Sequence, residues 1–171
     1  TATMKVKDDL IERLGYSNDL VCFQSSFNRP NLVYEIRSKK DLKDVDKDLA
    51  QLLQSRFKGL SGIIYCVSRK SCEQLASKLS KTHKVKCDYY HAELAMNKRN
   101  EVQRKWMSNE IQVIVATIAF GMGINKRDVR FVVHHSIPKS LEGYVQECGR
   151  SGREVPGGAH TGADCDGDNE G

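Results

Sequence analysis

Residues 62–67 read Gly-Ile-Ile-Tyr-Cys-Val and are followed by Ser68, a residue type that commonly caps a helix. A continuous apolar run of this length is typical of a strand that is buried on both faces. Apolar strand patterns recur further along the chain, at 111–117 and 130–135. Strands of this kind occur in parallel sheets that are covered by helices on both sides.

Helical patterns separate these strands. After Ser68, apolar residues recur with helical spacing over 72–79, a second helix is predicted at 97–107, and Ser140 precedes a third. Strand and helix alternate, and the connections are too long for hairpins, so right-handed βαβ units follow. The sequence therefore predicts an α/β fold with a parallel sheet and helices on both faces. Functional loops are expected at the carboxyl ends of the strands.

Composition fits one globular domain that binds a polyanion. The chain has 171 residues, of which 39% are hydrophobic, and a net charge of +5. No apolar run approaches the roughly 20 residues of a membrane span. The first residues show no basic region followed by an apolar one, so we do not expect a secreted protein. All 27 basic residues precede residue 154, whereas five of the 22 acidic ones follow residue 153, so residues 1–153 carry +10. Such a basic body favours nucleic acid as partner, and a solvated lysine-rich surface is the alternative.

The cysteines do not indicate a metal centre, and the last residues do not indicate a folded element. Six cysteines form no CxxC pair, so we expect reduced thiols in an intracellular protein and no zinc site in this segment. Residues 154–171 are rich in Gly and Asp and poor in apolar side chains. We expect them to form a disordered, solvated tail.

The first candidate site lies at 116–125, Ala-Thr-Ile-Ala-Phe-Gly-Met-Gly-Ile-Asn, directly after a buried strand. Gly121 and Gly123 would let backbone amides approach a phosphate closely, and Thr117 offers a hydroxyl. Two glycines alone are a weak signal, because a tight structural turn needs them as well.

The second candidate site is the segment 146–153, Gln-Glu-Cys-Gly-Arg-Ser-Gly-Arg. Arg150 and Arg153 lie three residues apart, and each guanidinium can bind two phosphate oxygens and stays charged. An arginine opposite a transferring phosphoryl group stabilises the charge that develops there. A pair of surface arginines is the simpler alternative.

Two further strand ends carry polar groups. Ser68 and Arg69 stand where a helix N-terminus presents free amides, which is a natural anion site. His91 follows the predicted strand 85–90 and suits contact with nucleic acid about as well as a structural hydrogen bond. Because these groups share one predicted edge of the sheet, they indicate a surface that faces phosphate.

These motifs together resemble those of RecQ-type DNA helicases, which belong to superfamily 2. The resemblance runs over residues 1–153, from Phe27-Asn28-Arg29-Pro30-Asn31 through GIIYCVSR, YYHAEL and ATIAFGMGINKRDVRFVVHHSIPKS to QECGRSGR. The pairing of ATIAFGMGI with QECGRSGR is the most specific part. RNA helicases of the DEAD-box group differ at both places, which disfavours an RNA-directed lobe.

The resemblance implies the second RecA-like lobe, of P-loop NTPase type, of an ATP-dependent motor that moves 3′ to 5′ on DNA. Residues 1–26 would end the first lobe, with Thr1-Ala2-Thr3 similar to the third motif, and 27–153 would form the second lobe. ATP and Mg²⁺ would bind between the lobes, and single-stranded or junction DNA would be the partner. Such enzymes unwind DNA in repair, recombination or replication, in the nucleus of a eukaryotic cell or otherwise inside the cell.

The resemblance also implies roles for single residues. Arg153 is similar to the arginine finger that reaches the γ-phosphate, with Arg150 and Gln146 supporting the interface. The positions that would line the nucleotide side are Gly121, Gly123 and Asn125. The positions that would grip the backbone of a single strand are Ser68, Arg69, His91 and Thr117.

The sequence also departs from the family. It contains no GxxxxGK[ST] loop, no DExH box, and neither the zinc-binding cysteines nor the winged helix. After Arg153 the family shows an apolar strand, where this chain turns into its Gly/Asp-rich tail. We therefore expect a fragment whose sheet lacks its last strand, whose ATP and Mg²⁺ are held mostly by the absent first lobe, and which alone hydrolyses ATP negligibly. The alternative is a non-enzymatic, single-stranded nucleic-acid-binding or regulatory module.

Overall fold

The computed structural model describes residues 9, 11–15, 29–39, 43–120 and 124–152, and the backbone of 158–163. The chain divides into two compact units, residues 1–30 and residues 31–171. In the first unit residues 11–14 are helical, and Arg13 forms an ion pair of 3.0 Å with Asp9. All candidate site residues belong to the second unit.

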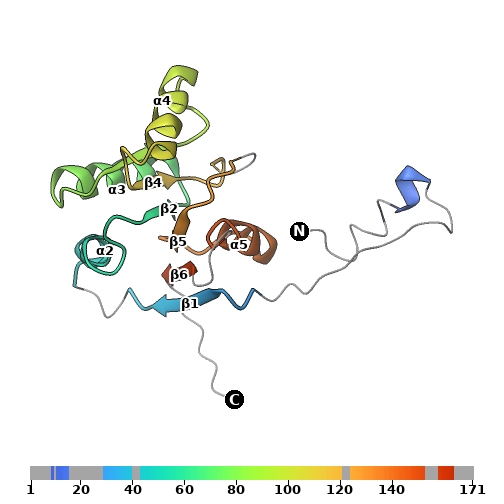
Figure 1. The fold of residues 1–171 in the computed structure, drawn as a ribbon, viewed down its shortest axis with the longest axis horizontal. Helices are drawn as coiled ribbons and strands as arrows, with labels where there is room; N and C mark the ends of the chain where they lie inside the picture. Colours follow the sequence, from blue (N-terminus) through green and yellow to red (C-terminus); the bar gives the residue numbers. More distant parts are fainter. Residues whose placement is uncertain are drawn as a thin grey trace, which may run out of the picture. The chain divides into compact units, whose positions relative to one another are not determined.

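The second unit is built around a six-stranded sheet whose strands are all parallel (Figure 1). Its strands are β1 (Leu32–Arg37), β2 (Ser61–Tyr65), β3 (Cys87–Tyr90), β4 (Val113–Ala116), β5 (Val129–His134) and β6 (Gly158–Ala163). Across the sheet they follow the order β1-β6-β5-β2-β4-β3. The predicted parallel α/β fold is confirmed.

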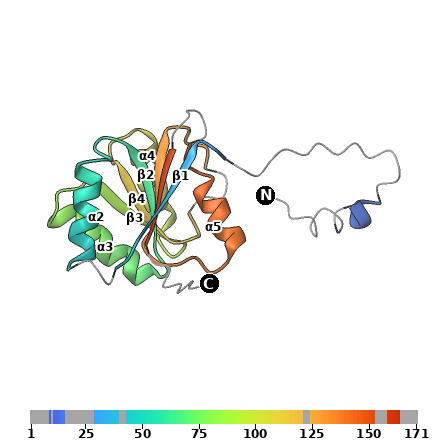
Figure 2. The same ribbon diagram turned by 90° about the horizontal axis from the view of Figure 1, so that it is seen from below.

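Helices cover both faces of this sheet. They are α2 (Val45–Gln54), α3 (Arg69–Lys81), α4 (Met96–Met107) and α5 (Leu141–Cys148). α2 and α3 lie on one side, and α5 lies on the other (Figure 2), the face on which α4 also packs. Ser68 and Ser140 cap α3 and α5 as predicted, each accepting a hydrogen bond of 3.1 Å from a backbone amide of the first turn. None of the helices in the described part of the chain is long and apolar enough to cross a membrane.

β2 forms the centre of the core, as its apolar sequence predicts. All five of its residues are buried, and its side chains alternate between the two layers: Ile64 packs toward α2 and α3, and Ile63 packs toward α4. Gly62 is required by close packing, because a Cβ there would lie 2.2 Å from ring atoms of Phe131. That ring stacks on Phe57 at a centroid distance of 4.3 Å.

The last strand differs from the sequence prediction. We expected 154–171 to be a disordered tail and the sheet to lack its final strand, but residues 158–163 form β6 between β1 and β5. Leu32 pairs with Gly158 on one side, and Phe131 pairs with Ala159 on the other. A parallel ladder uses backbone groups, and a strand with neighbours on both sides satisfies them whatever its side chains are. Residues 153–157 and 164–171 lie outside the described part of the chain.

Candidate functional site

The carboxyl ends of β2, β4 and β3 bring together the four candidate nucleic-acid contacts. These strands are neighbours in the sheet, and because they are parallel they end at the same edge. Ser68 and Arg69 follow β2, Thr117 follows β4 directly, and His91 follows β3 directly. Residues up to 49 positions apart in the sequence thus meet along one edge of the sheet.

The first turn of α3 is the most open part of this edge. Ser68 is exposed, and its hydroxyl accepts the amide of Ser71 at 3.1 Å and lies 2.8 Å from the Ser71 hydroxyl. The side chain of Arg69 is 53% exposed and forms an ion pair with Glu93, which lies in the loop after β3. The first turn of α3 contains no acidic residue, so its amides and its basic side chains create a local positive field.

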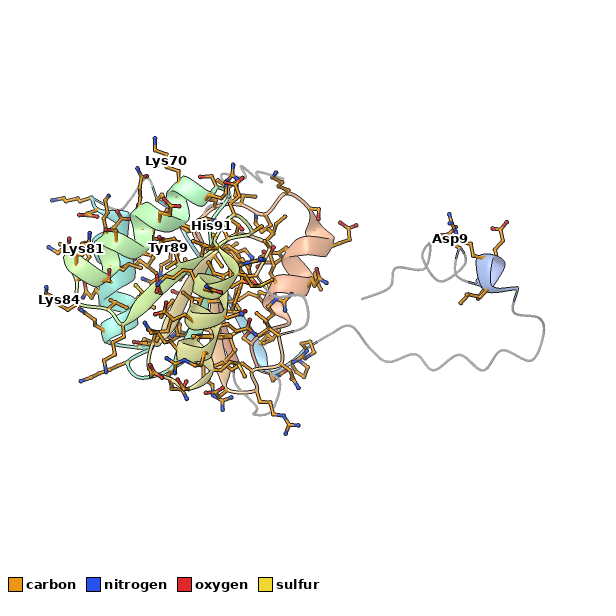
Figure 3. All side chains as sticks on the ribbon, turned by 90° about the horizontal axis from the view of Figure 1, so that it is seen from above. Asp9, Lys70, Lys81, Lys84, Tyr89 and His91 are labelled. Atoms are coloured by element: carbon orange, nitrogen blue, oxygen red, sulfur yellow. The ribbon has the colours of Figure 1, made fainter. Side chains whose placement is uncertain are left out.

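His91 is held inside the molecule. It is 5% exposed, its Nε2 lies 3.0 Å from Oε1 of Glu73 on α3, and its ring stacks on Tyr89 at 5.8 Å. His91 and Tyr89 lie beside α3, whereas the amines of Lys70 and Lys81 project from it (Figure 3). This geometry gives His91 the structural hydrogen bond that the sequence left open.

Thr117 begins a tight turn that returns the chain to the core. Its backbone amide donates to the carbonyl of Tyr90 at 3.3 Å, and its own carbonyl accepts the amide of Phe120 at 3.0 Å. Phe120 is 1% exposed and packs edge-on against Trp106 at 5.4 Å. Thr117 itself is only partly buried, in contrast to the residues of β4 that precede it.

Of the three nucleotide-side candidates, the structure describes Asn125 alone. Gly121 and Gly123 lie outside the described residues. Asn125 is exposed and precedes β5 by four residues, so it lies toward the opposite edge of the sheet. The next residue, Lys126, is buried there, with its Nζ 2.8 Å from Oδ1 of Asn109.

The segment 146–153 leaves α5 and is tied back to the sheet. Gln146 is exposed, and Arg150 is only 9% exposed. Burial raises the pKa of the Tyr65 hydroxyl, and the Arg150 guanidinium, which is hydrogen-bonded to it, acts in the opposite direction. The amide of Gly152 donates to the carbonyl of Val129 at 3.1 Å, which anchors the segment at the start of β5. Arg153 lies outside the described residues.

A pocket of about 180 Å³ opens between the ends of β2 and β5. Tyr65, His134, Lys139 and Glu147 contribute to its wall. His134 and Glu147 are buried, and Nε2 of the histidine lies 2.6 Å from a carboxylate oxygen of the glutamate. No local pattern in the sequence indicates this pair, because His134 ends a strand and Glu147 lies on a helix.

The described residues hold no group of three or more His, Cys, Asp or Glu side chains that could bind a metal ion. The cysteines within the described ranges, which are Cys66, Cys72, Cys87 and Cys148, form no disulfide. Burial raises the pKa of Cys87 and of Cys148 to about 12. These two thiols are therefore neutral at physiological pH and act as apolar packing groups.

Known proteins share this sequence over most of its length. The chain is 53% identical over 154 residues to ATP-dependent DNA helicase hus2/rqh1 of Schizosaccharomyces pombe, covering 90% of this chain and 11% of that protein. It is 51% identical over 156 residues to ATP-dependent DNA helicase Q-like 2 of Arabidopsis thaliana, covering 90% of this chain and 22% of that protein. It is 46% identical over 155 residues to ATP-dependent DNA helicase Q1 of Mus musculus, covering 90% of this chain and 24% of that protein. The chain thus spans about a tenth to a quarter of the length of these relatives.

A solved structure shares the fold. It is that of Mycobacterium smegmatis helicase Lhr bound to ssDNA and AMP-PNP, with a TM-score of 0.65 and 20% identity, covering 76% of this chain and 19% of that one. Residues 44–154 match the family model described as Helicase conserved C-terminal domain. The chain therefore belongs to the helicase conserved C-terminal domain family, and about half of its aligned residues are identical to those of RecQ-family DNA helicases.

Proposed function

We propose that this chain acts as the second RecA-like lobe of an ATP-dependent 3′–5′ DNA helicase of RecQ type. In this proposal residues 27–153 form the lobe, and residues 1–26 belong to the end of the first lobe and its linker. The observation that carries the proposal is the single sheet edge on which Ser68, Arg69 and Thr117 meet. In a eukaryotic cell such an enzyme would unwind DNA in the nucleus, during repair, recombination or replication.

The carboxyl edge of the sheet would hold the phosphate backbone of single-stranded or junction DNA. Arg69 and the first-turn amides of α3 would contact phosphate, and Thr117 would add a hydroxyl from the turn after β4. Lys70 strengthens the positive field, since it is exposed and no ion-pair partner is found for it among the described residues. His91 would act indirectly, by holding the loop after β3 against Glu73 of α3.

The nucleotide side would lie near the segment 146–153. ATP and Mg²⁺ would be held mostly by the first lobe, with Gly121, Gly123 and Asn125 lining the cleft from this side. Arg153 would supply positive charge to the γ-phosphate. The burial of Arg150 against Tyr65 suits a supporting role for it, and the exposed Gln146 is free to meet another lobe.

The phosphate contact of Arg69 can be tested by salt dependence. Arg69→Ala is expected to weaken binding of a single-stranded oligonucleotide about three- to tenfold at low salt and to lower the slope of log K against log salt by about 0.7, because one phosphate contact is lost. Fluorescence anisotropy over a salt series measures both. Arg104→Ala is the matched control, since Arg104 is 60% exposed and pairs with Glu110. Equal effects of the two variants would contradict the assignment.

The alternative function is a non-enzymatic, single-stranded nucleic-acid-binding or regulatory module. It is favoured by one observation, namely that these 171 residues contain neither a GxxxxGK[ST] loop nor a DExH box. We expect the chain alone to show no DNA-stimulated ATP hydrolysis above background, because the groups that hold ATP and activate water are missing from its sequence. A phosphate-release assay with and without DNA measures this. Turnover near that of a complete helicase would contradict the expectation.

A further inference from the structure

Glu93 stands directly beside the candidate phosphate contact. It lies in the loop after β3, and its carboxylate forms an ion pair with Arg69, the first residue of α3. We propose that Glu93 sets the affinity of this lobe for nucleic acid by competing with phosphate for the Arg69 guanidinium. The inference rests on the proposed function, since it deepens the role of the same edge.

The ion pair is open enough to be displaced. The side chains of Arg69 and Glu93 are 53% and 67% exposed, and pairs with this exposure contribute little to stability. Phosphate offers the guanidinium two oxygens in the same planar arrangement as a carboxylate. A nucleic-acid strand that arrives at the first turn of α3 can therefore take the place of Glu93.

After displacement the carboxylate remains close to the bound strand. The neighbouring His91 is buried and hydrogen-bonded to Glu73, so the start of the loop that carries Glu93 is held against α3. Glu93 therefore stays within several ångströms of the phosphate that replaces it, and two negative charges at that separation repel each other. The carboxylate thus lowers affinity twice, by occupying Arg69 in the free protein and by repelling phosphate in the complex.

A second exposed carboxylate of this lobe pairs with an arginine away from this edge. Glu110 offers a matched control, because its side chain is 48% exposed and pairs with Arg104 near the end of α4. α4 ends before β4 begins, so this pair lies toward the amino ends of the strands, at the edge opposite to Arg69. Neutralising Glu110 changes the net charge by the same amount as neutralising Glu93, but it does so far from the edge that is proposed to bind the nucleic acid.

The experiment measures binding of labelled single-stranded oligothymidylate to the full 171-residue chain by anisotropy over a salt series. Glu93→Gln is expected to tighten binding about three- to tenfold at low salt, because Arg69 no longer has to leave a carboxylate and no negative charge at residue 93 repels the bound phosphate. The salt slope should stay close to that of the wild type, since Arg69 contacts phosphate in both complexes. Glu110→Gln is expected to change affinity less than about twofold, since its charge is screened over that distance. In the Arg69→Ala background, Glu93→Gln should tighten binding less than it does in the wild type, because the competition for Arg69 is gone and only the repulsion of phosphate is left.

The other possible results contradict either the competition by Glu93 or the phosphate contact of Arg69. If Glu93→Gln leaves affinity unchanged or weakens it while Arg69→Ala weakens it, Glu93 does not compete with phosphate, although the proposed function stands. If Glu110→Gln tightens binding as much as Glu93→Gln, only net charge matters and the competition is refuted. If Arg69→Ala has no effect, the phosphate contact in the proposed function fails. If neither the wild type nor Glu93→Gln binds the oligonucleotide, the proposed function and the competition by Glu93 are both refuted.

Discussion

Arg153→Ala, introduced into a complete enzyme that contains this lobe, is expected to lower ATP turnover by about 10³–10⁵-fold. The physical reason is that an arginine finger stabilises negative charge that develops on the transferring phosphoryl group, which alanine cannot do. Binding of single-stranded DNA should stay within about twofold of the wild type, because the proposed nucleic-acid contacts do not include Arg153. Steady-state phosphate release and an anisotropy titration measure the two quantities.

The control for this variant is Arg104→Ala, which removes an exposed guanidinium that pairs with Glu110 on the same lobe. It should leave turnover nearly unchanged. If Arg153→Ala instead abolished DNA binding and left ATP turnover intact, Arg153 would not be the arginine finger. Arg150 would then be the next candidate, although its burial against Tyr65 argues for a supporting role.

Trp106→Ala is expected to lower the free energy of unfolding of the chain by about 3–5 kcal/mol. Trp106 is fully buried in the core layer between α4 and the sheet. Its ring meets Phe120 edge-on at 5.4 Å, and the amine of Lys126 lies over it at 5.4 Å. Alanine would leave a cavity and remove both contacts, so that a large part of the stability of a typical domain is lost.

Urea unfolding followed by circular dichroism measures this loss of stability. Fluorescence is not suitable, because Trp106 is the only tryptophan and its signal disappears with the substitution. Trp106→Phe should cost clearly less, because a ring remains in the site. Met107→Ala, at the neighbouring and 45% exposed position of the same helix, should cost less than about 1 kcal/mol. A loss below about 1 kcal/mol for Trp106→Ala would show that the core closes over the site.

The central part of the fold follows from local sequence signals. Ser61–Tyr65 is a buried strand because its apolar run has no polar face, and Ser68 and Ser140 cap helices because their hydroxyls reach the first-turn amides. β6 could not be predicted in this way. Its place depends on the backbone groups that β1 and β5 offer, and these strands lie far from it in the sequence.

The same distinction between local and long-range features applies to the candidate site. Strand ends are local features, so the grouping of Ser68, Arg69, Thr117 and His91 could be predicted from a parallel sheet alone. The partners of these residues could not. Glu73 and Glu93 reach His91 and Arg69 from other elements, through rotamers that no spacing in the sequence encodes. Whether a candidate side chain is open to a ligand, as for Arg69, or held inside, as for His91, depends on these partners.

The strand order has a consequence for how the molecule is made. Among the described residues, β1 is the first strand in the sequence and β6 is the last, yet they are neighbours, with Arg37 opposite Ala163. During synthesis from the amino end, the position between β1 and β5 stays empty until residue 163 has been added. Such distant parallel pairing is slow, and unpaired strand edges attract other chains. The nascent chain thus keeps one edge of β1 and one edge of β5 unpaired until β6 has been made, and this side of the sheet closes after the others.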